Sequence, residues 1–167
     1  LIDLKDDGTF RLNMDFFNYA TGLTMTNEKF STLFGKPVRN SKKDLLTQFH
    51  MDIASSIQVV TEEIVLRLTR SIAKDNESKN LCMSGGVALN CVANGKILKE
   101  KIFDNIWIQP AAGDAGGALG AALAIWHKEL KQERLKPIKD NMSGSYLGPS
   151  FNNDEILNKL TDLGATF

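Results

Sequence analysis

Residues 81–98 read LCMSGGVALNCVANGKIL, and this stretch decides the fold of the chain. A short apolar run at 79–83, a turn at Ser84-Gly85-Gly86 and a helical pattern over 87–101 predict a strand, a glycine turn and a helix. Glycines let the backbone come close to a ligand, and the first amides of a helix attract phosphate or carboxylate. A turn that serves packing alone explains the same residues. A Walker A motif would need glycine where Asn90 stands, and no GxGxxG occurs, so neither a P-loop nor a Rossmann site is expected.

A second unit of the same kind follows directly. NIWIQ (105–109) predicts a strand that Pro110 ends, and AAGDAGGALGAALAIWHKEL (111–130) predicts a turn at Gly113-Asp114 and a helix over 115–131. Asp114 stands where it either caps the helix or binds a divalent cation beside a phosphate. One carboxylate cannot hold a metal alone, so further ligands would be water or would lie outside this sequence. The helix carries small residues that allow a backbone or a ligand to come very close: Gly116, Gly117, Gly120, Ala121, Ala122 and Ala124.

The rest of the chain predicts a hairpin, a loop and a long helix. LIDLKDDGTFRLNM (1–14) reads as a hairpin turning at Asp7-Gly8, and we expect its strands in one sheet with those at Leu81 and Ile106. Residues 16–43 read as an irregular basic loop, which is either simply solvated or closes over an anionic ligand. A helix over 41–74 would reach roughly 50 Å, so it bends or packs against material outside this sequence. Its apolar stripe predicts a core face: Leu45, Phe49, Ile53, Ile57, Val60, Ile64, Leu68 and Ile72.

Composition excludes several classes of function. The 167 residues carry twenty basic and twenty acidic side chains, so no net field attracts nucleic acid or an anionic membrane. No apolar run reaches the roughly 20 residues that cross a bilayer. His50 and His127 each lack a helical histidine partner, so we expect structural roles for both. Cys82 and Cys91 fit neither a CxxC motif nor a zinc site, and we expect two buried thiols in a cytoplasmic protein. Because the chain opens at Leu1 inside a strand pattern, we expect an excised part of a longer protein.

Four blocks of sequence carry a resemblance to a known family. GGVALNCVANGKIL (85–98) followed by FDNIWIQPAAGDAGGALGAALAIWH (103–127) resembles the carbamoyltransferases of the nodulation-protein-U and antibiotic O-carbamoyltransferase type. DIASSIQVVTEEIVLRL (52–68) before these blocks and YLGPSFNNDEI (146–156) after them resemble the same family in the same order. The resemblance implies an α/β fold, a ribonuclease-H-like lobe of the actin, sugar-kinase and Hsp70 superfold with a mixed sheet flanked by helices. Residues 1–145 would form the second lobe of the larger ATPase-like domain, and 146–167 would form a linker and the start of a carbamoyl-phosphate-handling domain.

The resemblance also implies roles for individual residues. Gly85, Gly86 and Asn90 match the GGVxxN motif that approaches the adenine nucleotide, and Gly113 opens the second turn facing it. Asp114 matches the acidic residue that joins a histidine pair in holding a catalytic divalent metal, which is iron in characterised relatives. That histidine pair has no counterpart in this sequence, and the resemblance places it in the first lobe, upstream of Leu1. The missing first lobe and C-terminal domain would therefore complete the active site, and we expect this chain alone to be inactive.

The implied chemistry has two steps. Carbamoyl phosphate and ATP give carbamoyl adenylate, and the carbamoyl group then passes to a hydroxyl of a small-molecule acceptor. No side chain in this sequence is an evident general base, and nothing in it selects the acceptor. Other ATP-binding proteins of the superfold remain open: a tRNA threonylcarbamoyl transferase, a sugar or acetate kinase, or an actin-like or Hsp70-like scaffold without catalysis. GDA at 113–115, where the tRNA-modifying relatives usually carry TDN, favours the carbamoyltransferase.

Overall fold

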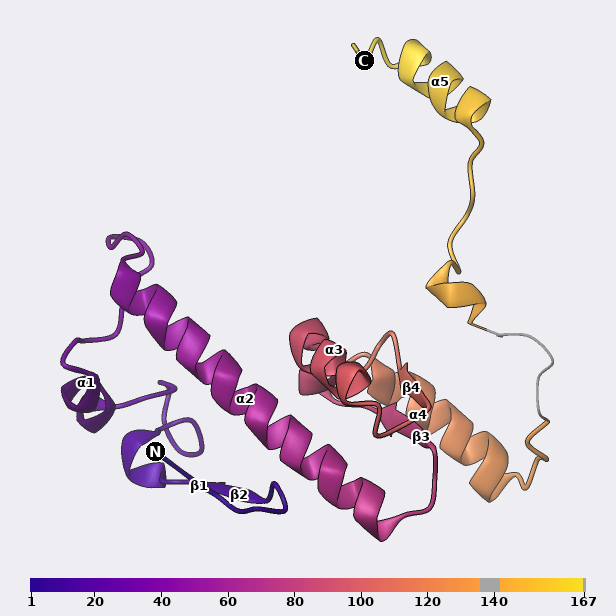
Figure 1. The fold of residues 1–167 in the computed structure, drawn as a ribbon. Helices are drawn as coiled ribbons and strands as arrows, with labels where there is room; N and C mark the ends of the chain where they lie inside the picture. The colour runs from indigo at the N-terminus through magenta and orange to yellow at the C-terminus, as the bar shows by residue number, and fades with distance from the viewer. Residues whose placement is uncertain (136–141, 167) are drawn as a thin grey trace. The chain divides into compact units, whose positions relative to one another are not determined.

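The computed structural model describes residues 1–135 and 142–166 (Figure 1). Helices and short strands follow one another along the chain, so the fold is mixed α/β, as the sequence predicts. The chain divides into two compact units, Leu1–Gly117 and Ala118–Phe167, which are described separately. Both glycine turns belong to the first unit. The predicted domain boundary between 145 and 146 lies inside the second unit and stays a prediction.

The hairpin at the beginning of the chain forms as predicted. β1 (Ile2–Leu4) and β2 (Phe10–Leu12) pair antiparallel. The turn between them closes when the Gly8 N–H donates to the carbonyl of Lys5 at 3.1 Å. Gly8 has a φ of 86°, in the left-handed region that favours glycine, so the Asp-Gly signal identified this turn correctly.

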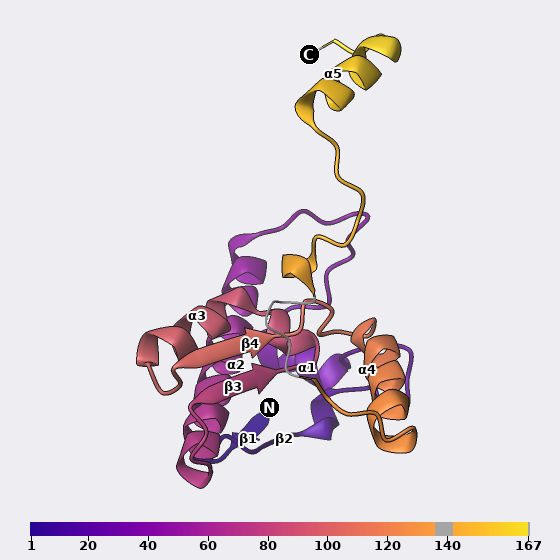
Figure 2. The same ribbon diagram turned by 90° about the vertical axis from the view of Figure 1, so that its right-hand side faces the viewer.

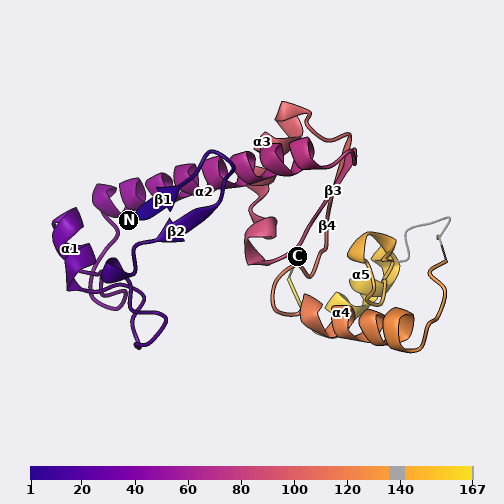
Figure 3. The same ribbon diagram turned by 90° about the horizontal axis from the view of Figure 1, so that it is seen from below.

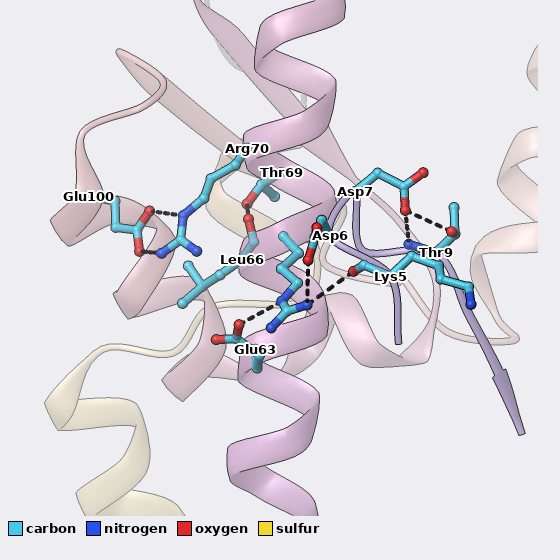
Figure 4. A network of polar contacts seen from close by, with 10 residues as sticks. Lys5, Asp6, Asp7, Thr9, Glu63, Leu66, Thr69, Arg70 and Glu100 are labelled. Carbon is cyan, nitrogen blue, oxygen red and sulfur yellow. Dashed lines mark hydrogen bonds and ion pairs between the residues drawn. The ribbon is translucent and has the colours of Figure 1, made fainter. Parts of the chain in front are cut away.

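The hairpin turn lies directly against the long helix α2 (Gln48–Asp75). A Cβ on Gly8 would come within 2.4 Å of the backbone nitrogen of Leu68, so only glycine allows this approach. Arg67 holds the same turn, because its Nη1 donates to the Lys5 carbonyl at 3.2 Å (Figure 4). The hairpin is therefore fixed to the second half of α2 by a close backbone approach and by one arginine.

α2 begins at Gln48 and not at Ser41, which corrects the predicted start. Before it, the chain turns at Asn40, whose carbonyl accepts the N–H of Asp44 at 2.8 Å. Thr47 is the N-cap, and its N–H donates to the Nδ1 of His50 at 3.0 Å. His50 therefore has the structural role that we expected, and the apolar period continued past the true beginning of the helix.

The buried face of α2 also differs from the predicted stripe. Leu45 precedes the helix, and Leu45, Ile57 and Ile72 are exposed. Burial is confined to one stretch in the second half of the helix, where α2 contacts the next helix along the chain. The buried residues of α2 are Glu62, Val65, Leu66 and Thr69. Burial thus depends on where neighbouring elements pack, which the period of the sequence does not report.

The segment predicted as an irregular loop contains a helix, so that prediction is wrong in part. The segment follows a short 3-10 turn at Met14–Phe16 and includes α1 (Glu28–Phe34). Asn27 caps α1 by accepting the N–H of Phe30 at 3.3 Å, and Gly35, with a φ of 71°, ends it in the left-handed conformation. An asparagine cap and a glycine stop are ordinary helix signals, and here they mark a helix of only seven residues.

The core lies where a strand–helix–strand unit packs on α2. β3 (Asn80–Met83), α3 (Cys91–Glu100) and β4 (Asn105–Ile108) follow α2 along the chain, and β3 and β4 pair in parallel (Figure 2). Ile97 of α3 is 0% exposed at the centre of this core. The buried cluster consists of Val65, Leu66, Leu81, Ala93, Ile97 and Phe103. Burial of these side chains supplies the hydrophobic stabilisation that holds the unit on α2.

An ion pair at the edge of the core also joins the two helices. The Arg70 Nε of α2 donates to the Glu100 Oε2 of α3 at 2.9 Å, and a second contact makes the pair bidentate (Figure 4). Bidentate arginine–carboxylate pairs fix orientation as well as contributing energy. The pair raises the pKa of Arg70 further above its ordinary value, mainly through the hydrogen bond to Glu100.

The strands do not form the single sheet that the sequence analysis predicts. Within the described residues, β1–β2 is one two-stranded sheet and β3–β4 is another. Figure 1 shows α2 between the hairpin and the β3–α3–β4 unit, and Figure 3 shows β3 leaving the carboxyl-terminal end of α2. The hairpin packs on α2 through its turn at Gly8. Its strands form no hydrogen-bonded ladder with β3 or β4.

Both cysteines are exposed, which corrects the expectation of buried thiols. Cys82 alternates with the buried Leu81 along β3, so its side chain projects from the opposite face of the sheet. Cys91 is the first residue of α3, where a side chain is not covered by a preceding turn. The expectation failed because the lack of a disulfide or metal spacing indicates free thiols but does not specify which face of a strand or helix is covered.

The second unit contains the rest of the helix that follows the second glycine turn. α4 (Gly116–Ala124) continues as a π-helical turn at Ile125–Glu129, close to the predicted span. A short 3-10 turn at Ser143–Ser145 and α5 (Asn153–Asp162) complete the described elements. Among the described residues, no helix combines the length and the apolar character that crossing a bilayer requires.

Candidate functional site

The two glycine turns meet at one edge of the parallel pair. β3 and β4 are parallel, and Met83 lies opposite Ile108 at their carboxyl ends. Both turns therefore follow the strands at the same edge of the sheet. The Gly85 N–H donates to the carbonyl of Ala112 at 2.8 Å, which joins the first turn to the second. The sequence analysis predicted two neighbouring turns, and the structure adds the hydrogen bond that couples them. Crevices at the carboxyl ends of parallel strands are where α/β folds bind ligands.

The three glycines predicted to face nucleotide have open space in front of them. A Cβ built on Gly85, Gly86 or Gly113 would meet no heavy atom within 4 Å. Gly85 has a φ of 99°, so its conformation favours glycine whatever lies nearby. Gly86 and Gly113 have no such backbone reason to be glycine. Packing within the described chain therefore does not account for these two, and contact with a bound ligand stays a prediction for them.

Asn90 is placed differently from the expectation. The predicted helix over 87–101 is interrupted, because a 3-10 turn occupies Gly86–Leu89 and α3 begins only at Cys91. Asn90 is the N-cap of α3, and its Oδ1 accepts the N–H of Ala93 at 3.1 Å. The first amides of α3 therefore come after Asn90 and not directly after Gly86, which corrects the predicted helix start. A contact between Asn90 and nucleotide stays a prediction.

A polar cluster that the sequence analysis did not identify surrounds Asn90. The amide groups of Asn90 and Gln58 bond to each other, with Asn90 Nδ2 donating to Gln58 Oε1 at 2.9 Å. Gln58 also donates to the buried Glu62, which pairs with Lys96 of α3. The spacing of Gln58 and Glu62 by four places them on one helix face, but nothing in the sequence connects that face to Asn90.

Asp114 lies in the loop before α4, and its side chain is exposed. Within residues 1–135 and 142–166, its carboxylate makes no hydrogen bond or ion pair, although its carbonyl accepts the Gly117 N–H at 3.3 Å. A free, exposed carboxylate has the chemistry of a ligand for a divalent cation. No group of three histidine, cysteine or acidic side chains suited to a metal occurs among the described residues. Asp114 therefore fits a metal only as one ligand of several, and its metal role stays a prediction.

Gly116 fixes the shape of the loop that carries Asp114. A Cβ on Gly116 would lie 2.1 Å from the carbonyl oxygen of Ala111, which is too close for any side chain. The Gly116 N–H also donates to the Gly113 carbonyl at 3.1 Å. The loop is therefore wound tightly over residues 111–116, which include the carbonyl that bonds Gly85.

Comparison with known proteins identifies the family. A profile of the family described as Carbamoyltransferase N-terminus matches residues 1–123, which include both glycine turns and Asp114. The chain belongs to this carbamoyltransferase family. The resemblance noted from the four sequence blocks is thereby confirmed, and the family is one of transferases.

Individual relatives of this carbamoyltransferase chain extend the match beyond residue 123. The uncharacterized protein sll1178 of Synechocystis sp. is 65% identical over 156 residues, which cover 93% of this chain and 25% of that protein. Nodulation protein NolO of Bradyrhizobium diazoefficiens is 41% identical over 155 residues, 92% of this chain and 25% of NolO. Nodulation protein NolNO of Sinorhizobium fredii is 36% identical over 159 residues, 93% of this chain and 20% of NolNO. The chain thus spans a quarter or less of the length of these relatives.

Proposed function

We propose that this chain is one part of an ATP-dependent O-carbamoyltransferase. In the complete enzyme, hydrolysis of carbamoyl phosphate would release phosphate and leave a carbamate, whose oxygen would attack the α-phosphorus of ATP to give carbamoyl adenylate and pyrophosphate. The carbamoyl group would then pass to a hydroxyl of a small-molecule acceptor, with release of AMP. Family membership supports the transfer of a carbamoyl group. The observation that carries the nucleotide part is the hydrogen bond from the Gly85 N–H to the Ala112 carbonyl, which joins two glycine turns at the carboxyl edge of parallel strands.

The backbone of the joined turns would bind the nucleotide. The open space in front of Gly85, Gly86 and Gly113 lets phosphate or ribose come closer than any side chain would permit. Asn90, at the end of the first turn, has one amide hydrogen left after its bond to Gln58, because that nitrogen carries two. These groups would hold the adenylate while the acceptor oxygen attacks the carbamoyl carbon and AMP leaves.

Asp114 would hold the divalent metal together with ligands from the rest of the enzyme. A bound cation supplies Lewis-acid polarisation of a carbonyl or phosphoryl oxygen. Asp114 suits this role because its carboxylate is exposed and unpaired among the described residues, two residues beyond the carbonyl that bonds Gly85. Iron is the metal that the family resemblance implies.

We further propose that the β3–α3–β4 unit belongs to a ribonuclease-H-like lobe of the actin, sugar-kinase and Hsp70 superfold. Parallel strands usually lie in sheets covered on both faces. Within the described unit Leu1–Gly117 only one face of β3–β4 is covered, and Trp107 is exposed on the other. The exposed face supports additional elements of a larger domain, in keeping with relatives of which the matched region covers only 25%.

The decisive experiment follows the fate of ATP in the complete enzyme. With carbamoyl phosphate labelled in its carbonyl carbon, the proposal predicts that ATP is converted to AMP only when carbamoyl phosphate is present. The label should then appear in a hydroxyl compound drawn from sugars, aminoglycosides, cephems and polyketides. Conversion of ATP to ADP would instead indicate a kinase or a nucleotide-dependent scaffold.

Two controls make this result specific. The 167-residue chain alone should produce no AMP, because it supplies neither the histidine pair nor the carbamoyl-phosphate domain. A threonylcarbamoyl transferase would leave carbamoyl phosphate untouched and would modify tRNA. Turnover by the chain alone, or activity on tRNA, would contradict the proposal.

A further inference from the structure

The side chain of Asn90 is held in one orientation by Gln58. Asn90 Nδ2 donates to Gln58 Oε1 at 2.9 Å, and Gln58 Nε2 donates back to Asn90 Oδ1 at 3.1 Å. Asn90 Oδ1 also accepts the N–H of Ala93 at 3.1 Å. Rotating the Asn90 amide by half a turn would bring its nitrogen against two donors, so only one orientation satisfies these contacts.

Gln58 is held in turn by a buried ion pair. Its Nε2 also donates to Glu62 Oε1 at 2.8 Å, so both of its amide hydrogens are used. Glu62 is 5% exposed, and its other oxygen pairs with the Nζ of Lys96. A carboxylate so buried needs such partners to stay charged. The hydrogen bond from Lys96, and after it that from Gln58, hold the pKa of Glu62 below its ordinary value.

The polar cluster joins α2 to α3 through two pairs of side chains, Gln58 with Asn90 and Glu62 with Lys96. Gln58 and Glu62 are one turn apart on α2, while Asn90 and Lys96 stand at the beginning and in the middle of α3. Each residue of α2 holds one residue of α3, so α3 can neither slide along α2 nor rotate without breaking a bond. Such two-point contacts fix register as well as distance.

Asn90 transmits this restraint to the first glycine turn. Its N–H donates to the Val87 carbonyl at 2.9 Å, which closes the 3-10 turn after Gly86. Asn94, one turn further along α3, donates to the Ala88 carbonyl at 2.7 Å. The 86–89 turn is therefore anchored to α3 at its far end and to the Ala112 loop at its near end through Gly85.

We propose that Gln58, Glu62 and Lys96 form a positioning clamp that orients Asn90 and the 85–90 turn for nucleotide binding. This inference rests on the proposed function, because it assigns the clamp to the nucleotide site of the carbamoyltransferase. Gln58 contacts no nucleotide itself and acts through Asn90. Loss of the clamp should therefore weaken nucleotide binding even in variants that stay fully folded at the temperature of the measurement.

The experiment compares two glutamines of α2 in the complete enzyme. Gln58→Met keeps the length of the side chain but removes its hydrogen bonds. Gln48→Met is the matched control, since Gln48 Nε2 donates to Asp52 Oδ1 at 2.8 Å with the same spacing of four, on an exposed part of the same helix. ATP affinity is measured by isothermal titration calorimetry and folding by thermal unfolding. Gln58→Met should raise the Kd for ATP about tenfold, by analogy with residues that orient metal ligands, whose loss typically costs about 10–100-fold in affinity. Gln48→Met should leave the Kd unchanged.

A double-variant test separates positioning from general support. Asn90→Ser keeps a capping oxygen for α3 but cannot pair with an amide at position 58. If Gln58 acts through Asn90, adding Gln58→Met to Asn90→Ser should weaken ATP binding no further. Independent, additive losses would overturn the proposal.

Variants of Lys96 test the other end of the clamp. They also replace Gln58→Met as the test if that variant does not fold. Lys96→Arg preserves the charge facing Glu62 and should keep the Kd for ATP close to that of the wild type, whereas Lys96→Met should raise it. An unchanged Kd in folded Gln58→Met or Lys96→Met enzyme would overturn the clamp and leave the proposed function intact. A complete wild-type enzyme that does not bind ATP would overturn both.

Discussion

Two adjacent glycines at the beginning of α4 give a sharp test of the loop that carries the candidate site. An alanine Cβ at position 116 would lie 2.1 Å from the carbonyl oxygen of Ala111, about 1.3 Å short of the 3.4 Å at which ordinary contact begins. An alanine Cβ at position 117 would meet nothing within 4 Å. The obstacle at 116 is backbone, so the whole 111–116 loop must move to relieve it.

The pair of variants isolates this steric term. Both replacements gain helix propensity by losing a glycine, so the gain largely cancels between them. Forcing atoms into a closely packed position costs about 1–3 kcal/mol, which sets the expected difference in unfolding free energy. For a protein of this size, that difference amounts to about 2–12 °C in Tm. Gly117→Ala should be as stable as the wild type or more stable, and Gly116→Ala less stable.

The same variants report on function in the complete enzyme. Moving the loop in Gly116→Ala would pull the Ala112 carbonyl away from the Gly85 N–H, 2.8 Å distant in this structure. ATP affinity should therefore fall in Gly116→Ala and persist in Gly117→Ala, as measured by calorimetry beside urea and thermal unfolding. Equal stability and equal affinity of the two variants would refute the close approach at Gly116 and the coupling of the two turns.

Three further outcomes are expected. Asp114→Asn removes the charge that a cation needs, so metal content and turnover of the complete enzyme should fall without loss of folding. Metal content is measured by mass spectrometry, and full occupancy in the variant would show that Asp114 is not a ligand. The pKa of Glu62 lies below its ordinary 4.5, chiefly through Lys96, so its stabilisation is present above pH 4.5 and is lost as the pH falls through the folded pKa. The stability advantage of the wild type over Glu62→Gln should shrink on acidification, and an equal advantage at pH 3 and pH 7 in urea titrations would contradict this sign. Ile97→Ala should cost about 2–5 kcal/mol in unfolding free energy because the residue is fully buried, whereas Leu98→Ala, at a position 60% exposed, should cost well under half as much by the same assay.

The parts of the fold that the sequence predicts are those with local signals. The strands at β3 and β4, the glycine turns and the Asp7-Gly8 hairpin were recognisable because each is bounded by residues that break or bend the chain. The meeting of the two turns follows from parallel pairing. The hydrogen bond between Gly85 and Ala112 itself could not be predicted, since it depends on the exact depth of each loop.

The errors arise where local signals compete or where packing decides. The apolar period extends back past Thr47 to Leu45 and predicts a longer helix. The N-cap at Thr47 is the stronger signal, and α2 begins directly after it. A continuous helix was predicted after Gly86 because apolar residues follow it, whereas Asn90 offers the cap that begins α3. Burial of the cysteines and the union of all strands in one sheet both required knowledge of neighbours that no local pattern contains.

The clamp around Glu62 was beyond sequence reasoning for a different reason. Gln58 and Asn90 lie far apart along the chain, as do Glu62 and Lys96, so no window of sequence contains both partners of either contact. Each residue by itself looks like an ordinary polar position of a helix surface. Only the packing of α3 on α2 turns Glu62 into a buried carboxylate.

If the joined turns bind nucleotide as proposed, stability and nucleotide binding should be separable at most positions of this chain. Gly86, Gly113 and Asp114 contribute no side chain to the buried cluster between α2, α3 and the parallel strands, so changes there should alter binding while the core survives. Two positions are different: Gly116 shapes the loop that carries the Ala112 carbonyl, and Glu62 is buried beside the core and is connected through Gln58 to Asn90 at the end of the glycine turn. Under the proposed function the charge of Glu62 would contribute to both properties, and conditions that neutralise it should weaken folding and nucleotide affinity together.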